Sequence, residues 1–440
     1  MNPLPVEATK DADKKASSER ITFKMKIMKK MSRKFTLLLM CMSLAIVAEA
    51  NEVTPQTMFE MAKKEQSAFL DTVQTLVNID SGTGNKDGLN KIEGILTQRL
   101  TELEANVMLE PPRSGVGNIV LGYLQGKGKA KFLLMIHYDT VFAEGEAQRR
   151  PFRSEQGRIF GPGVADAKGS LALILHSLKL LNEMNYDDYG TITVLFNADE
   201  EKGSFGSRDL IQETAAGHDY VLSYEPPDTD AVSVATSGIN YLFLDVTGVA
   251  SHAGSAPDLG RNAIIELSHQ LLQLNDLGNP DKKTTVNWTL VKGGEKRNII
   301  PDRASAEGDM RFSDYSEIER VTNDAQKIIQ NQLIPGTQVS FHLQRGRPPL
   351  PSNPISKQLA ITAQKVYKDI GLDLDITKMH FGTDAGYAYQ EGAEKPAVLE
   401  TLGLVGNGLH SPKEYALLNS IAPRLYLTIA LIMELSKHSK

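Results

Sequence analysis

The sequence predicts an α/β protein with a mixed, largely parallel sheet, helices on both faces of that sheet, and a smaller α+β domain inserted into it. Apolar runs of strand length alternate with stretches of helical spacing between residues 55 and 226, as in sheets built from strand–helix–strand units. The runs are apolar at nearly every position, which is typical of strands buried on both faces. After about residue 236 the pattern changes to strand, helix, strand, strand, helix, strand, the order of a ferredoxin-like domain.

The larger domain is predicted to begin with two helices, at residues 55–79 and 89–103, where apolar residues recur three and four positions apart. The elements that follow are strands at 118–124 and 131–139, a helix at 170–184, and strands at 191–199 and 220–226. Sheets of this kind form their functional sites at the carboxyl ends of the strands. Polar residues that directly follow these apolar runs are therefore candidates for function.

The inserted domain is expected over residues 236–345, between two parts of the larger domain at 51–235 and 346–440. Its strands are predicted at 241–248, 284–294, 304–312 and 337–344, and its helices at 262–274 and 317–333. The helices have apolar positions at helical spacing.

Residues 1–50 indicate a signal peptide. Basic residues precede an apolar stretch at 35–47, and Ala48-Glu49-Ala50 has the form of a cleavage site. The stretch is short for a membrane span, so we expect a secreted or periplasmic chain that starts at Asn51 and has no membrane part after cleavage. The alternatives are an uncleaved anchor or lipidation at Cys41. Cys41 is the only cysteine, so the mature chain would have neither a disulfide nor a thiolate ligand.

The composition is that of a soluble globular protein. The 440 residues carry a net charge of −6, with 41% hydrophobic and 23% charged residues, which are ordinary values. The sequence has no basic stripe with interleaved aromatic residues, so nothing indicates a nucleic-acid partner.

Five side chains that commonly bind metals lie near the ends of apolar runs or in glycine-rich loops. They are His137, Asp166, Glu201, Glu225 and His410. Two imidazoles and three carboxylates suit zinc. Five ligands are too many for one tetrahedral ion and enough for two ions that share a carboxylate. A bridging hydroxide would balance the charge that remains between two Zn²⁺ and three carboxylates. Paired metal ions indicate hydrolysis.

Two further acids fit around such a site. Asp139 lies two positions after His137, so on a strand both point to one side, and Asp139 could accept the second ring N–H of the histidine. Glu200 and Glu201 are adjacent and would face opposite ways in an extended chain, so we assign Glu201 to a metal and Glu200 to the general base.

Each position taken alone also has an ordinary explanation. The pair His137 and Asp139 could be an exposed strand end, Asp166 a helix N-cap, Glu200 and Glu201 a solvated acidic turn, and His410 a loop residue. The metal hypothesis depends on the set, because burying several carboxylates together without cations would be very costly.

The sequence resembles the carboxypeptidase G, or glutamate carboxypeptidase, branch of the aminoacylase-like co-catalytic zinc metallopeptidase family. The resemblance extends through most of the mature chain. It is carried by the stretches YGTITVLFNADEEKGSFGSRDLIQE, SHAGSAPDLG, RNIIP, RGRP, GTDA and ETLGLVGNGLHS. Two departures are that Phe381-Gly382-Thr383-Asp384 stands where the family has Gly-Gly-Thr-Asp, and that the short loop at 228–232 has no lysine.

The resemblance implies a zinc-peptidase catalytic domain with an inserted lid or dimerisation domain, and two Zn²⁺ per subunit. One zinc would be bound by His137, Asp166 and Glu225, and the other by Asp166, Glu201 and His410. Asp166 would bridge the ions, Glu200 would be the base, and Asp139 would orient His137.

The resemblance also implies the residues that bind the substrate. His252 would approach the substrate carbonyl, and in several relatives it comes from the partner subunit, which implies a homodimer through the inserted domain. Asn298 and Arg311 would hold the substrate carboxylate and neighbouring oxygens. Arg347 and the pair Gly382-Thr383 are further substrate-binding candidates.

The expected function is that of a di-zinc exopeptidase. It would hydrolyse the amide bond to a C-terminal amino acid with a free α-carboxylate, glutamate above all, in folates or N-acyl-glutamates, by a metal-bridged hydroxide with Glu200 as base. The side-chain carboxylate of glutamate needs a second cation, for which Arg345, Arg347 and Lys296 are available. The alternatives are an aminoacylase, deacetylase or dipeptidase of the same family, and a non-catalytic periplasmic binding protein.

Overall fold

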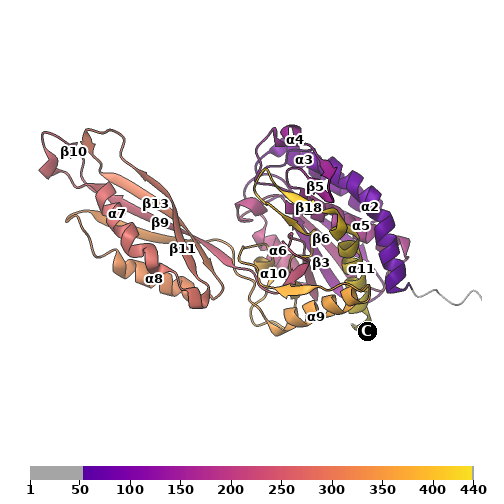
Figure 1. The fold of residues 1–440 in the computed structure, drawn as a ribbon. Coiled ribbons are helices and arrows are strands. Elements are labelled where there is room, and N and C mark those ends of the chain that lie inside the picture. Colours follow the sequence, from indigo (N-terminus) through magenta and orange to yellow (C-terminus); the bar gives the residue numbers. More distant parts are fainter. Residues whose placement is uncertain (1–52, 439–440) are drawn as a thin grey trace, which may run out of the picture. The chain divides into compact units, whose positions relative to one another are not determined.

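The computed structural model describes residues 53–438, so the predicted signal peptide and Cys41 lie outside the described residues. The central element is a six-stranded mixed sheet (Figure 1). Across the sheet the strands are β1 (Asn106–Glu110), β2 (Ile119–Gln125), β6 (Thr191–Asn197), β3 (Lys131–His137), β7 (Tyr220–Ser223) and β16 (Ala397–Leu399). The last four run parallel to one another, while β1 and β2 are antiparallel to their neighbours. The prediction of a mixed, largely parallel sheet is confirmed.

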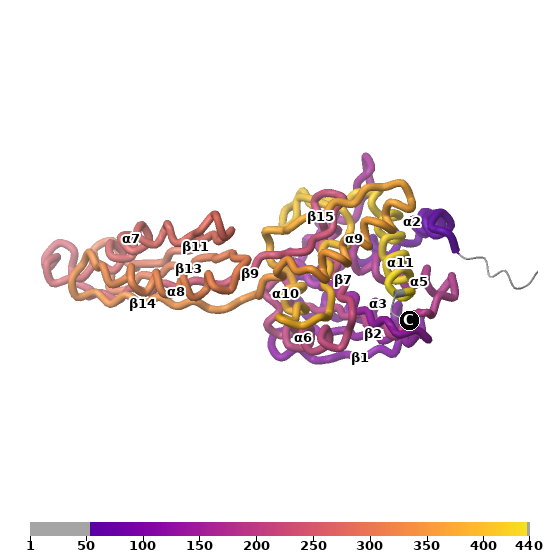
Figure 2. Tube along the Cα trace, turned by 90° about the horizontal axis from the view of Figure 1, so that it is seen from below, coloured from indigo at the N-terminus to yellow at the C-terminus, as the bar shows by residue number. Residues whose placement is uncertain are grey.

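Helices cover both faces of this sheet (Figures 1 and 2). On one side α2 (Pro55–Val77), α5 (Gly169–Glu183) and α11 (Ile421–His438) pack against one another, α9 (Pro354–Lys368) packs on α11, and α3 (Lys86–Glu102) lies on β1 and β2. The opposite face of the sheet packs against α6 (Arg208–Ala216) and α10 (Ala385–Ala388). The stretch Leu418–Lys437 is long and apolar enough to cross a membrane, but 72% of it is buried inside the fold, as in a core helix.

The strands of a second sheet and the two helices that pack on it follow one another in the predicted order β-α-β-β-α-β. Its elements are β9 (Gly238–Thr247), α7 (Ala263–Leu274), β11 (Thr285–Gly293), β13 (Arg303–Phe312), α8 (Ser316–Ile328) and β14 (Gln338–Arg345). The four antiparallel strands lie in the order β11-β13-β9-β14, and one core joins this sheet to both helices through residues such as Leu244, Leu267 and Val321. The division at 51–235, 236–345 and 346–440 stays a prediction, because Pro55–Lys440 form a single compact unit.

The structure contains short elements that the sequence did not predict. The strands are β4 (Arg153–Glu155), β5 (Arg158–Phe160), β8 (Ala231–Ser233), β10 (Ser251–His252), β12 (Ile299–Ile300), β15 (Asp375–Thr377), β17 (Gly406–Asn407) and β18 (Tyr415–Leu417). The short helices are α4 (Glu146–Arg149) and the turns η1 (Val164–Lys168), η2 (Glu200–Lys202), η3 (Pro257–Leu259), η4 (Asn275–Leu277), η5 (Pro280–Lys282) and η6 (Leu418–Ser420). Elements of two to five residues are too short for a periodic pattern.

Candidate metal centre

Three of the predicted ligands follow the carboxyl ends of parallel strands. His137 is the last residue of β3, Glu201 lies in η2 after β6, and Glu225 comes two residues after β7. Because β6, β3 and β7 are adjacent and parallel, their ends meet at one edge of the sheet. Asp166 and His410 reach this edge from loops, Asp166 in η1 just before α5 and His410 just before β18.

Asp166 lies between the two histidines. Its Oδ1 is 3.0 Å from Nε2 of His137, and its Oδ2 is 3.1 Å from Nε2 of His410. Each histidine has one further carboxylate beside it: Glu225 Oε1 lies 3.6 Å from His137 Nε2, and Glu201 Oε2 lies 3.3 Å from His410 Nε2. The five side chains therefore form two histidine–carboxylate sets that share Asp166.

Burial and hydrogen bonds both shift the pKa values of the side chains in this cluster. Burial opposes ionisation of Asp166, but hydrogen bonds with His137 and His410 outweigh it and hold the pKa of Asp166 below its usual range. The hydrogen bond to Asp166 and one to Glu201 raise the pKa of His410 to about 10. Burial raises the pKa of Glu201 and of Glu225 above the ordinary value. Without a cation, these acids must therefore share protons or bear repulsion.

The donor set fits metal ions. His137, Asp166 and Glu201 offer ligand atoms within 4.8 Å of one another, and so do His137, Glu200 and Glu225. In addition, Glu201 Oε1 is buried without a hydrogen-bond partner. A buried carboxylate oxygen with no donor is costly, and a metal ion would provide the missing partner. Imidazole nitrogen and carboxylate oxygen are ligands that zinc accepts.

Asp139 ties the strand ends together. Its Oδ1 lies 3.2 Å from His137 Nδ1 and accepts the backbone N–H of Glu200 at 3.2 Å. Its Oδ2 accepts the hydroxyl of Thr83 at 2.6 Å and the N–H of Glu201 at 3.3 Å. The ring nitrogen Nδ1 of His137 also lies 3.0 Å from the Asp139 carbonyl oxygen. One buried carboxylate thus orients His137 and fixes the turn that carries both glutamates.

Glu200 is paired with Arg347, which sequence reasoning placed against the substrate. Arg347 Nη2 lies 2.8 Å from Glu200 Oε1 and also donates to the Glu200 carbonyl oxygen. Arg347 Nε lies 3.7 Å from Asp384 Oδ1, and Asp384 in turn accepts from Asn197 and Ser204. Burial raises the pKa of Glu200 to about 8, although Arg347 acts in the opposite direction.

A buried acid that the sequence did not reveal holds the loop of Asp166. The Glu414 carboxylate accepts the backbone N–H groups of Gly163, Ala165 and Asp166 at 2.9–3.0 Å. In the sequence Glu414 stands beside Lys413, which is the pattern of a solvated charged turn. The sequence indicates Asp384 only as part of the GTDA stretch and does not predict its contact with Arg347.

A cavity of about 440 Å³ opens onto the cluster. Its walls include Asp166, Glu200, Glu201, Glu225, His410, Tyr241, Arg311, Arg347, Gly382 and Thr383. Arg311 was predicted to bind the carboxylate of the substrate. Its Nε lies 2.8 Å from Oδ1 of Asp309, which also lines the cavity. Gly382 packs closely against the first residues of β9, because an added Cβ would lie 2.7 Å from the Ile239 side chain.

His252 and Asn298 do not line this cavity. They lie beside each other in the second sheet's domain, where β10 pairs with β12 and the N–H of Ala253 donates to the Asn298 carbonyl oxygen at 3.0 Å. His252 is exposed, and its Nδ1 accepts the N–H groups of Gly254 and Ser255 at 3.1 and 3.0 Å. A neutral ring in this state carries its proton on Nε2 and can donate from there.

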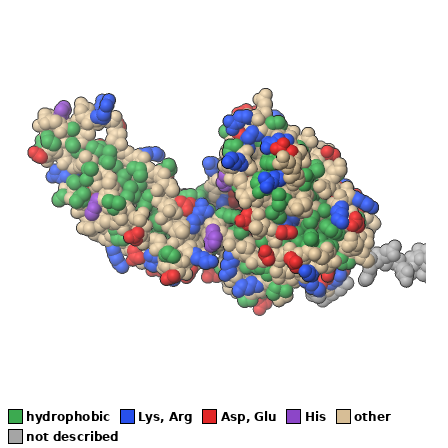
Figure 3. All heavy atoms as spheres, viewed as in Figure 1, with side chains coloured by type: hydrophobic (Ala, Val, Ile, Leu, Met, Phe, Trp, Pro, Cys, Tyr) green, Lys and Arg blue, Asp and Glu red, His purple; other side chains and the backbone are tan. Residues whose placement is uncertain are grey.

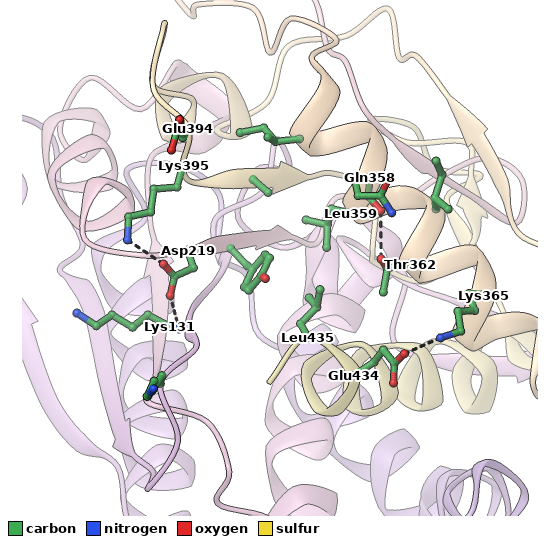
Figure 4. A pocket seen from close by; sticks show the side chains of 15 residues that line it. Lys131, Asp219, Gln358, Leu359, Thr362, Lys365, Glu394, Lys395, Glu434 and Leu435 are labelled. Carbon is green, nitrogen blue, oxygen red and sulfur yellow. Dashed lines mark hydrogen bonds and ion pairs between the residues drawn. The ribbon is translucent and has the colours of Figure 1, made fainter. Parts of the chain in front are cut away.

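A larger hollow of about 840 Å³ lies at the opposite, amino ends of β3, β7 and β16, next to α9 and α11 (Figure 4). Lys395 pairs with Asp219 at 2.9 Å and Lys365 with Glu434 at 2.7 Å in its walls. None of the predicted site residues lines it. Size therefore does not identify the reactive cavity here, and the chemistry of the walls does.

Comparison with known proteins identifies the family. Residues 133–434 match the model of peptidase family M20/M25/M40. The chain is 42% identical to carboxypeptidase G2 of Pseudomonas sp. (strain RS-16) over 383 residues, which cover 86% of this chain and 92% of that protein.

Solved structures share the fold. A tripeptidase from Staphylococcus aureus superposes with a TM-score of 0.72 at 22% identity, covering 84% of this chain and 99% of that one. An M20 family metallo-carboxypeptidase from Sulfolobus solfataricus superposes with a TM-score of 0.67 at 17% identity, covering 83% and 98%. With its histidine–carboxylate cluster at the carboxyl edge of the sheet, this chain belongs to peptidase family M20/M25/M40 and is a metallo-carboxypeptidase.

Proposed function

We propose that this protein is a di-zinc exopeptidase that releases a C-terminal glutamate from folate-type or N-acyl-glutamate substrates. The observation that carries the proposal is the position of Asp166, with one carboxylate oxygen toward each of two histidines that each have a further carboxylate beside them. A carboxylate in this position could bridge a pair of metal ions.

The family resemblance assigns the ligands to two metal sets, and the contacts of Asp166 with both histidines support this assignment. His137, Asp166 and Glu225 would hold one zinc, and Asp166, Glu201 and His410 the other. When bound, a pair of Zn²⁺ ions lowers the pKa of water and polarises a carbonyl group. The buried Glu201 Oε1 without a donor supports this reading.

Glu200 is the proposed base. It lies in the cavity wall, and burial brings its pKa to about 8, near the operating pH at which proton transfer is most effective. Arg347 occupies Oε1, so Oε2 is the oxygen that would take a proton from the attacking water and pass it to the leaving amine. Arg347 and Asp384 would keep the carboxylate in position for both transfers.

Arg311 is the proposed ligand of the free α-carboxylate. It lines the cavity and pairs with Asp309 through Nε. A substrate carboxylate would replace Asp309 or share the guanidinium, whose planar fork suits two parallel hydrogen bonds. An internal peptide bond has no such carboxylate, which accounts for exopeptidase specificity.

Glutamate specificity needs another cation. Of the three cations considered from the sequence, Arg347 is paired with Glu200, Lys296 lines a different cavity, and Arg345 lies outside the walls of the metal cavity. An adjoining cavity of about 500 Å³ shares the walls Phe381 and Leu409 with the metal cavity and contains Lys378 and His380. Neither has an ion-pair partner among residues 53–438, so we assign the side-chain carboxylate to them.

We also propose a homodimer in which the partner's copy of His252 completes the site. His252 and Asn298 lie outside the cavity of their own chain. β11 is an edge strand of the second sheet, and its Val291 is 62% exposed. Leu272 on α7 is 79% exposed. Figure 3 shows hydrophobic side chains gathered on this domain. Covering an exposed apolar strand edge is a common reason for association.

The protein is proposed to act outside the cytoplasm, in the periplasm or as a secreted enzyme. This proposal rests on the basic and apolar leader with its Ala48-Glu49-Ala50 cleavage pattern. A mature chain without cysteine would suit an oxidising compartment. Sequencing the amino terminus of the exported protein would test it, with Asn51 as the expected first residue.

The decisive experiment uses zinc-loaded protein comprising residues 51–440. Release of free glutamate from folate is compared with hydrolysis of N-acetyl-glutamate and of a glycyl dipeptide, with and without a chelator. Metal-dependent preference for folate supports the proposal. Metal-dependent activity on the other two alone would favour an aminoacylase or dipeptidase. Two bound zinc ions without activity on any of them would favour a binding protein.

A further inference from the structure

Both carboxylate oxygens of Glu414 accept hydrogen bonds from the loop that carries Asp166. Oε1 accepts the N–H groups of Ala165 at 2.9 Å and Asp166 at 3.0 Å, and Oε2 accepts the N–H of Gly163 at 3.0 Å. The residue is only 1% exposed. Water therefore does not compete for these three donors, and the carboxylate is their partner in the fold.

The loop needs such a partner because its backbone is irregular. Gly163 has a φ of +75°, and within η1 Asp166 (φ −117°, ψ 88°) and Ala167 (φ −133°, ψ 31°) depart from helical angles. A helical ladder therefore cannot satisfy these N–H groups. The carboxylate of Glu414 takes its place, and so fixes the backbone from which the Asp166 side chain extends toward both histidines.

Glu414 is itself anchored on a rigid element. Its neighbour Tyr415 begins β18, which pairs with β5 through Phe160, three residues before Gly163. Four residues earlier in the chain stands His410, which contacts Asp166 Oδ2. One short segment therefore carries a proposed metal ligand and also the acid that fixes the ligand proposed to bridge the two ions, although the two ligands lie 244 positions apart.

The neighbouring buried cation does not replace this role. Lys168 ends the same loop, but its Nζ donates to the Ile79 carbonyl oxygen at 2.7 Å. Lys168 thus ties the loop to the chain before it, while Glu414 alone receives the N–H of Asp166 among the described residues.

We propose that Glu414 is a positioning residue for metal binding, which holds Asp166 so that its two oxygens face the two halves of the centre. The inference rests on the proposed di-metal site. It assigns to Glu414 no contact with metal or substrate, and it predicts that losing the carboxylate weakens metal affinity more than it weakens the fold.

The test is a zinc titration of metal-free protein in competition with a chromophoric chelator, for wild type, Glu414→Gln and Glu414→Ala. The matched control is Glu65→Gln. Glu65 is another buried carboxylate, paired with His176 at 2.6 Å and Lys179 at 2.7 Å between α2 and α5. Thermal unfolding of each metal-free protein is measured alongside.

We expect both Glu414 variants to bind zinc about 10–100-fold more weakly, the usual effect of losing an outer-shell partner. Glu65→Gln should lower the unfolding midpoint by at least as much while its zinc affinity stays at the wild-type value. Wild-type zinc affinity in Glu414→Gln would overturn the proposal. Wild type that binds no zinc would instead refute the di-metal function.

A second measurement avoids variants that fail to fold. Hydrogen exchange of metal-free wild type should show protected amides at 163, 165 and 166, because Glu414 holds them before any ion arrives. If these amides exchange freely until zinc is added, the metal orders the loop and Glu414 does not position it.

Discussion

Replacing Asp139 with asparagine should weaken the metal centre by an amount that its contacts define. The carboxylate accepts three hydrogen bonds and faces a fourth potential donor, His137 Nδ1. Asparagine has one acceptor oxygen and one NH₂ group. The least costly orientation keeps the oxygen toward His137 and Glu200 and turns the NH₂ toward Thr83, whose hydroxyl can rotate to accept. The N–H of Glu201 then loses its acceptor.

One buried N–H without a partner costs about 1–3 kcal/mol, and each 1.36 kcal/mol is a factor of ten. We therefore expect Asp139→Asn to lower zinc affinity and kcat/KM about fivefold to 150-fold, because Glu201 and His137 lose their alignment. Chelator competition and steady-state hydrolysis of an N-acyl-glutamate measure the two quantities.

Thr83→Val is the matched control. It removes the hydroxyl that donates to Oδ2 at 2.6 Å but leaves the carboxylate to both backbone N–H groups, so its loss should be the smaller of the two. If Asp139→Asn keeps zinc affinity and kcat/KM within twofold of wild type, the reasoning from unpaired donors is refuted.

Four further outcomes are expected. Glu200→Gln should retain two zinc ions by elemental analysis and lose about 10²–10⁴-fold in kcat. A variant that keeps half of the wild-type kcat would point to another base. Chelation should abolish hydrolysis and lower the unfolding midpoint, because bound zinc adds about 4 kcal/mol at a thousandfold excess over Kd; an unchanged midpoint in calorimetry would argue against a metal among the buried acids. Lys378→Met should reduce kcat/KM for N-acyl-glutamate and spare the neutral glutamine analogue, and an equal effect on both would remove Lys378 from substrate recognition. Val291→Asp should convert a dimer into a monomer by light scattering and reduce turnover with it; a persistent, active dimer would place the interface elsewhere.

The sequence predicted the long elements because their periodicity is physical. α2, α5 and β3 bury a face or a whole element, so their apolar positions are regular, and their ends matched the prediction within a few residues. The ligands could be proposed because the sequence has a set of five acids and histidines that commonly bind metals, and burying several carboxylates together without cations would be very costly. Strands such as β10 and β12, with two residues each, leave no such pattern.

The supporting contacts could not be found in this way, although Arg347 itself was named as a substrate-binding candidate. Glu414 binds three backbone N–H groups some 250 positions away, and Arg347 binds the carboxylate and the carbonyl oxygen of Glu200, 147 positions away. Neither contact leaves a local spacing, and a charged residue in a polar turn has the same appearance whether it is solvated or buried. Only the tertiary arrangement separates the two cases.

The two histidines of the cluster differ in their access to water. The His137 side chain is 0% exposed, while that of His410, on a loop at φ +58°, is 57% exposed. In the proposed di-zinc centre, an ion beside His410 would be more open to competing cations and chelators than an ion beside the buried His137. The ion beside His410 would then be the more easily exchanged of the two, and limited zinc would leave enzyme enriched in the ion beside His137.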